Sequence, residues 1–124
     1  MGIRLVYGLR TGDISYLDIF HPSRRLKEAA LAAGLDYAAM IHSPSDPPSR
    51  ILDFCAGQTE KHVALLRGEL PDSLFSYLET EGIRVVNPAT AVALARDKLA
   101  SADFFAAIGA RHPRTVLHHP RTVL

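Results

Sequence analysis

Three cationic side chains lie where they could bind an anion. Arg10 follows the apolar run "IRLVYG", Arg67 ends the apolar run "HVALLR", and Lys98 follows Asp97 at the start of a predicted helix. A guanidinium can hold a carboxylate through two parallel hydrogen bonds, and an ammonium is a compact point charge that suits a polyphosphate. The residue types therefore indicate recognition of a carboxylate or a phosphate.

Each cation also has an ordinary structural interpretation. Arg67 could be a surface arginine that pairs with Glu69 or Asp72. The loop "GLRTGD" around Arg10 has no G-x-G-x-x-G spacing, so it could be a flexible connection. Lys98 could be a first-turn residue of a helix capped by Asp97, where the helix dipole slightly opposes a positive charge.

The other reactive residue types predict neither a metal nor a catalytic site. The six histidines fit no metal-binding spacing, and His118 and His119 are sequence neighbours. Cys55 is the single cysteine and lies between Phe54 and Ala56, so we expect a small buried apolar side chain in a reducing compartment. We expect no metal ligand and no catalytic residue in this chain.

Hydrophobic periodicity predicts alternating strands and helices. Apolar runs predict strands, and helical spacing with Pro or Asn before it and Gly after it predicts helices. Strands are expected at 3–8, 35–42, 50–54 ("RILDF"), 62–67, 83–87 and 114–117, and helices at 21–34, 70–82, 89–95 and 95–109. This order is typical of a Rossmann-like α/β fold, with a mostly parallel sheet and helices on both faces.

Ligands of such folds bind beyond the carboxyl ends of the strands. In this sequence the rule selects Gly8, Arg10, Arg67 and Asn87 as substrate-binding candidates. Asn87 precedes Pro88 and could serve only as a helix cap.

Composition narrows the classes of partner. The net charge is +1, and the basic excess lies in the tail, because no acidic residue follows Asp103 while three arginines do. No basic stripe carries interleaved aromatic residues, so we expect no nucleic-acid partner. No apolar run is long enough to span a bilayer and no signal peptide is recognisable, so we expect no membrane partner and a cytoplasmic protein.

The stretch "EGIRVVNPATAVALARDKLASADFFAAIGARHPRTVL" (81–117) resembles the junction before the catalytic region of ATP-grasp ligases, particularly the glutamate-ligase type that modifies a ribosomal protein. "ALLRGELPDSLFSYLE" upstream is also similar, so the resemblance covers 63–117 well and the first sixty residues in outline. The matching residues are Gly82, Val85, Val86, Asn87, Asp97, Lys98, Gly109, Pro113 and Thr115.

The resemblance implies an ATP-dependent ligase that joins a carboxylate to an amine, with ATP and magnesium as cofactors and a small carboxylate or amino acid as substrate. It implies a pre-ATP-grasp domain at 1–96 and the start of the ATP-grasp region at 97–117, followed by a tail at 118–124. Lys98 would contact the nucleotide phosphates.

The sequence departs from this family after Thr115, where an extended catalytic region should follow. Instead "RHPRTVL" is followed by "HHPRTVL", which suggests a duplication at a broken gene end. We therefore expect the front domain of a ligase, inactive alone, whose missing partner is the catalytic region. Apolar residues left uncovered between Leu99 and Ile108 would then favour self-association. The alternatives are a stand-alone module that binds a small carboxylate and a non-functional remnant.

Overall fold

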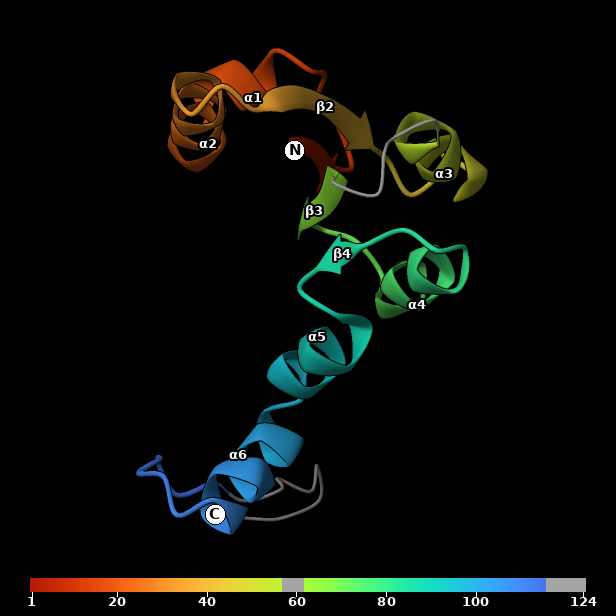
Figure 1. The fold of residues 1–124 in the computed structure, drawn as a ribbon. Helices are drawn as coiled ribbons and strands as arrows, with labels where there is room; N and C mark the ends of the chain where they lie inside the picture. Colours follow the sequence, from red (N-terminus) through yellow and green to blue (C-terminus); the bar gives the residue numbers. More distant parts are fainter. Residues whose placement is uncertain (57–61, 116–124) are drawn as a thin grey trace. The chain divides into compact units, whose positions relative to one another are not determined.

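An α/β fold with one parallel sheet is described for residues 1–56 and 62–115 of the computed structural model (Figure 1). Its strands are β1 (Gly2–Gly8), β2 (Asp36–His42), β3 (His62–Gly68) and β4 (Val85–Val86). Its helices are α1 (Tyr16–Ile19), α2 (His21–Ala32), α3 (Ser49–Cys55), α4 (Asp72–Thr80), α5 (Ala89–Arg96) and α6 (Lys98–Ala107). The predicted Rossmann-like class is confirmed.

The strand order places helices on both faces of the sheet. The order is β2-β1-β3-β4, and all three strand pairs are parallel. Because such crossovers are right-handed, the helix between β1 and β2 lies on one face and the helices after β2 lie on the other. Figure 1 shows this arrangement, with α2 on one side of the strands and α3 and α4 on the opposite side. The direction of winding reverses between β1 and β3, and there the sheet has its topological switch point.

The core is formed by the two middle strands and the helices that cover them. The largest fully buried side chains are Leu5, Val6, Ile51 and Leu78, from β1, α3 and α4. Because successive side chains of a strand point to opposite faces, Leu5 and Val6 are buried on opposite faces of the sheet. The sheet is therefore packed on both faces, as its apolar sequence predicts.

The predicted strand "RILDF" is wrong, because these residues belong to α3. Ile51 and Cys55 are four residues apart and both are buried, which is the spacing of one helix face. A short apolar run does not distinguish a buried strand from a buried helix by itself. The prediction that Cys55 is a small buried apolar side chain is confirmed, and burial raises the pKa of its thiol.

The chain divides into two compact units, Met1–Ala89 and Thr90–Leu124. Our sequence-based boundary after residue 96 stays a prediction. In the second unit Asp97 caps α6, since its Oδ1 accepts a hydrogen bond of 2.9 Å from the Ala100 N–H. Gly109 follows this helix with a φ of +75°, a conformation that suits glycine, as expected for a helix stop.

The predicted last strand lies only partly within the described residues. Arg114 and Thr115 are not in a strand, while residues 116 and 117 and the repeated tail lie outside the described part of the chain. None of the described helices has the length and apolar character required to cross a lipid bilayer.

Candidate functional site

The carboxyl ends of β1 and β3 approach each other closely at the switch point. Gly8 pairs with Gly68, and the Glu69 N–H donates a hydrogen bond of 3.0 Å to the Gly8 carbonyl. A Cβ on Gly68 would lie 2.5 Å from that carbonyl oxygen, and Gly68 has a φ of +78°. A Cβ on Gly8 would collide with the Glu69 backbone. Two glycines therefore let the strand ends meet.

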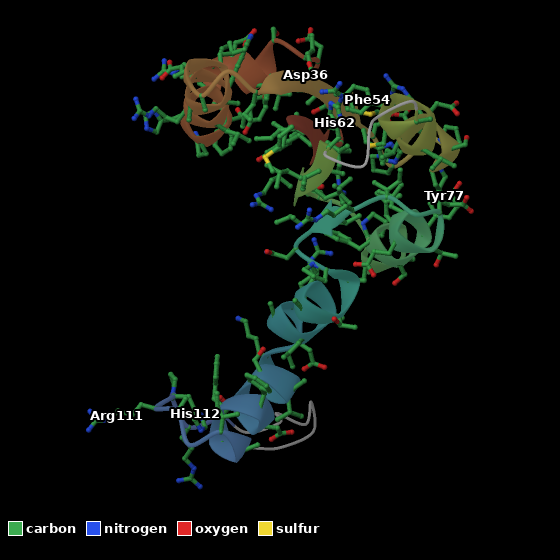
Figure 2. The ribbon with its side chains drawn as sticks, viewed as in Figure 1. Asp36, Phe54, His62, Tyr77, Arg111 and His112 are labelled. Carbon is green, nitrogen blue, oxygen red and sulfur yellow. The ribbon has the colours of Figure 1, made fainter. Side chains whose placement is uncertain are left out.

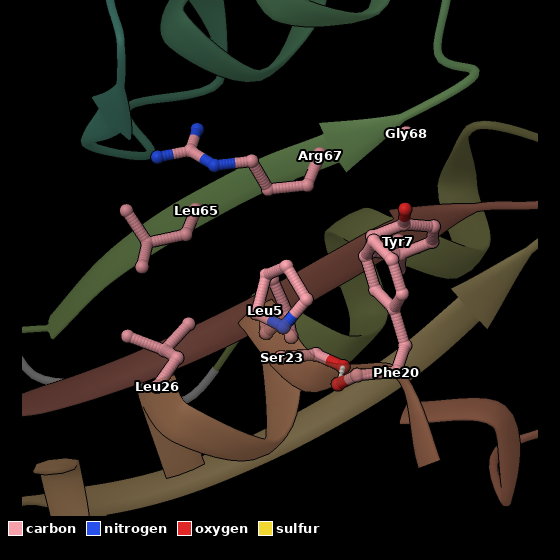
Figure 3. Close-up of a pocket in the computed structure, with 9 residues that line it drawn as sticks. Leu5, Tyr7, Phe20, Ser23, Leu26, Leu65, Arg67 and Gly68 are labelled. Carbon is pink, nitrogen blue, oxygen red and sulfur yellow. Dashed lines mark hydrogen bonds between the residues drawn. The ribbon is translucent and has the colours of Figure 1, made fainter. Parts of the chain in front are cut away.

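A pocket of about 380 Å³ lies over these strand ends. The register sets Leu5 beside Leu65 and Tyr7 beside Arg67, so four alternate side chains share the face of the sheet that α2 partly covers. Figure 3 shows Leu65 and Arg67 on one side of the pocket, with Phe20, Ser23 and Leu26 of the α2 region on the other. The pocket is lined by Leu5, Tyr7, Phe20, Pro22, Ser23, Leu26, Leu65, Arg67 and Gly68.

One wall of this pocket belongs to an aromatic cluster. The Tyr7 ring meets the Phe20 ring edge to face at a centroid distance of 5.8 Å, and Phe20 stacks on Tyr16 at 5.2 Å. Burial, with a smaller effect from Tyr16, raises the pKa of Tyr7. The Tyr7 hydroxyl therefore stays protonated at neutral pH.

Arg67 carries a charge that no carboxylate neutralises within the described part of the chain. Its Nη1 donates a hydrogen bond of 3.1 Å to the Leu66 carbonyl, and it takes part in no salt bridge there. Glu69, one of the two surface partners that the sequence offered, pairs instead with Arg10 at 3.1 Å. That pair is largely exposed, so it contributes little to stability.

The structure brings together some of the predicted site residues. Gly8 and Arg10 line a second hollow of about 330 Å³, and Tyr7 and Gly68 line both this hollow and the Arg67 pocket. The two hollows are therefore adjacent at the carboxyl ends of β1 and β3, and the role of these residues in substrate binding stays a prediction.

Asn87 follows β4, which pairs with β3 through Leu65 and Val86, and it lines neither hollow. The Val86–Asn87 peptide bond is cis. At the start of α5, the Ala89 N–H donates a hydrogen bond of 2.6 Å to Glu79 Oε1, so a carboxylate of α4 satisfies a backbone group there.

Lys98 belongs to the second unit and is the first residue of α6 after the Asp97 cap. Its side chain is exposed. Its role as a contact to nucleotide phosphates stays a prediction.

Sequence reasoning missed a polar cluster at the opposite, amino-terminal edge of the sheet. Asp36 Oδ2 accepts a hydrogen bond of 2.8 Å from Arg4 Nη2. It lies 3.1 Å from His62 Nε2, and Figure 2 labels Asp36 and His62 near each other. The Arg4 and His62 contacts hold the pKa of Asp36 below its ordinary value. A Cβ on Gly2 would collide with the His62 ring, so glycine makes room for it. The cluster joins β1, β2 and β3.

Within residues 1–56 and 62–115, no three His, Cys, Asp or Glu side chains are grouped as metal ligands. His42, at the end of β2, is 6% exposed, and its Nδ1 has no hydrogen-bond partner among the described residues. Burial lowers the pKa of His42, the nearby Asp46 opposes this shift, and Arg50 adds to it.

We expect His42 to make the fold less stable in mild acid. In the unfolded chain His42 has the ordinary His pKa of about 6.5, and in the folded protein its pKa is lower. The unfolded chain therefore binds a proton more readily than the folded protein does. The free energy of unfolding should therefore fall as the pH drops below about 6.5, by at most about 1.4 kcal/mol per pH unit for one group. Urea unfolding between pH 7.5 and 5 measures this slope. His42→Gln should make the free energy of unfolding depend less on pH, and substitution of the exposed His21 (His21→Gln) should not. Equal slopes in the unaltered protein and both variants would show that His42 does not cause the dependence on pH.

These features define an α/β domain with a largely apolar, singly cationic pocket beside its switch point. No protein-family model matches the chain, and no curated protein or solved structure is significantly similar to it.

Proposed function

We propose that this chain is the substrate-side domain of an ATP-dependent carboxylate–amine ligase and that the Arg67 pocket holds the carboxylate. The observation that carries the proposal is the Arg67 guanidinium, which has no carboxylate partner in the described structure and lines a ligand-sized pocket at the switch point. Pockets of about 300 to 1,000 Å³ are usual for small ligands. The ligase assignment is supported by the residues of 81–117 that resemble the ATP-grasp family.

The proposed task of the pocket residues is to bind and orient the carboxylate. Arg67 would hold it through two parallel hydrogen bonds. Tyr7, protonated at neutral pH, lines the same pocket and adds no charge to it. In ligases of this type, ATP would supply the phosphoryl group that activates the carboxylate, and magnesium would neutralise charge on the phosphate oxygens. Only Lys98 is assigned to the nucleotide here, and the described residues group no three His, Cys, Asp or Glu side chains as metal ligands, so we derive no step through ATP.

A second candidate function is a stand-alone module that binds small carboxylates. All nine residues that line the pocket lie within the first compact unit, Met1–Ala89, so this unit contains the complete pocket. The two candidates share the pocket and differ in the need for a catalytic region. Sequencing the transcript beyond residue 124 distinguishes them, because an in-frame catalytic region supports the ligase and a stop codon supports the module.

The carboxylate site is tested by a chemical-shift titration with acetate, propionate, succinate and citrate. We expect shifts at Tyr7, Arg67 and Gly68, with Arg67→Lys weakening binding by about tenfold although the charge is kept, because lysine loses the two-point geometry. Arg84→Lys is the matched control, since Arg84 is exposed and does not line the pocket. Shifts confined to the Asp36 and His62 edge, or to Gly34 and Gly82, which follow α2 and α4, would contradict the assignment.

Calorimetry with ATP tests the role as a substrate-side domain. We expect no binding tighter than about millimolar, or around −4 kcal/mol, because a single assigned contact, Lys98, cannot hold a triphosphate tightly. Micromolar binding that is lost in Lys98→Ala would show instead that this chain has a nucleotide site of its own.

A further inference from the structure

We infer that the pocket selects a carboxylate with one negative charge and a flat apolar body, such as an arylalkyl carboxylate, over small di- and tricarboxylates. This inference rests on the proposed function, because it names the substrate class of the same site. It follows from the charges, the side walls and the shape of the pocket.

The pocket offers ionic pairing for only one carboxylate. Arg67 is the single charged residue among the nine that line it. The other polar side chains are Tyr7 and Ser23, and Ser23 Oγ already donates to the Leu17 carbonyl at 2.7 Å and lies 2.9 Å from the Phe20 carbonyl. A second carboxylate would find no second cation among these nine residues, so it would gain no ion pair. An α-ammonium would also lack an ionic partner, because no Asp or Glu lines the pocket.

The remaining surface of the pocket suits a flat ring. Leu5 and Leu65 lie side by side in register, and Leu26 extends from α2 on the other side. Tyr7 and Phe20 form an edge-to-face pair, and a third aromatic ring can join such a pair at a centroid distance of about 4.5 to 7 Å.

The cation and the apolar surface lie close together. Figure 3 shows the Arg67 side chain extending back over Leu65, so the guanidinium lies beside the apolar side chains. A ligand that placed its carboxylate on Arg67 would therefore place its body against the leucines and the aromatic pair. Charge and shape together favour a monoanion with an apolar body.

The test is a titration of the unaltered protein with 3-phenylpropionate, its uncharged amide, propionate, phenylalanine and succinate. We expect 3-phenylpropionate to bind at least about tenfold tighter than each of the other four ligands, a difference of about 1.4 kcal/mol. Succinate binding as tightly as 3-phenylpropionate would overturn this inference and leave the carboxylate site intact. Binding of none of the carboxylates would overturn the proposed function itself.

A pair of variants on one helix tests the apolar wall. Leu26→Gln should weaken binding of 3-phenylpropionate several-fold and binding of propionate much less, because it alters the surface for the apolar body and propionate has only a short one. Leu31→Gln is the control, since Leu31 lies on the same helix, is 57% exposed and does not line the pocket. An equal effect of both variants on 3-phenylpropionate would contradict the proposed wall. If Leu26→Gln unfolds the protein, the titration of the unaltered protein with the five ligands still tests the inferred selectivity.

Discussion

Gly68→Ala is expected to lower the free energy of unfolding by roughly 2 to 5 kcal/mol. Backbone strain and a steric clash both contribute to this loss. A left-handed backbone is unfavourable for alanine by about 1 to 2 kcal/mol, and Gly68 has a φ of +78°. The new methyl would also lie 2.5 Å from the Gly8 carbonyl oxygen and 2.8 Å from the Tyr7 ring. Urea unfolding of the two proteins measures the difference.

Gly34→Ala isolates the first of these costs. Gly34 has a φ of +72°, and a Cβ there would meet no atom within 4 Å. This variant should therefore lose only about 1 to 2 kcal/mol, the cost of the left-handed conformation. Equal losses for Gly34→Ala and Gly68→Ala would show that the strand ends relax around an added methyl. The close approach of β1 and β3 would then not require glycine.

Leu78→Ala is expected to lower the free energy of unfolding by about 2 to 5 kcal/mol, the usual cost of removing a buried leucine side chain. Leu78 has no exposed surface and belongs to α4, the helix that lies on the side of the sheet opposite α2 in Figure 1. Its removal would leave a cavity between the helix and the sheet. Thermal or urea unfolding measures the loss.

Leu31→Ala provides the comparison for this core substitution. Leu31 is 57% exposed on α2, and a surface substitution typically changes stability by less than about 0.5 kcal/mol. A loss for Leu78→Ala as small as that for Leu31→Ala would mean that α4 does not pack on the sheet as described.

Most of the fold could be predicted from the sequence because local pattern and final structure agree. The runs "IRLVYG" and "HVALLR" are apolar, bounded by polar or glycine-containing segments, and both are strands. The α3 segment could not be assigned in this way, because its apolar residues form a run too short to show a period. Its helical state becomes evident only from the joint burial of Ile51 and Cys55.

The candidate site was only partly predictable. Arg67 was found because it ends the apolar run "HVALLR", and the strand-end rule selects residues at that position together with Gly8. Its pocket wall was missed, because Tyr7 and Phe20 come together only once the register of β1 and the position of α2 are known. The same holds for the Arg4, Asp36 and His62 cluster, whose members are far apart in sequence and lie on three different strands.

The position of β1 has a consequence for synthesis on the ribosome. β1 lies between β2 and β3, yet it is synthesised before both of them. Synthesis proceeds at about 5 to 20 residues per second. One edge of β1 therefore stays unpaired until Asp36–His42 is made, and the other stays unpaired for several seconds until His62–Gly68 is made. An apolar strand with unpaired edges can pair with other chains. The nascent protein is therefore most prone to aggregation before β3 has left the ribosome.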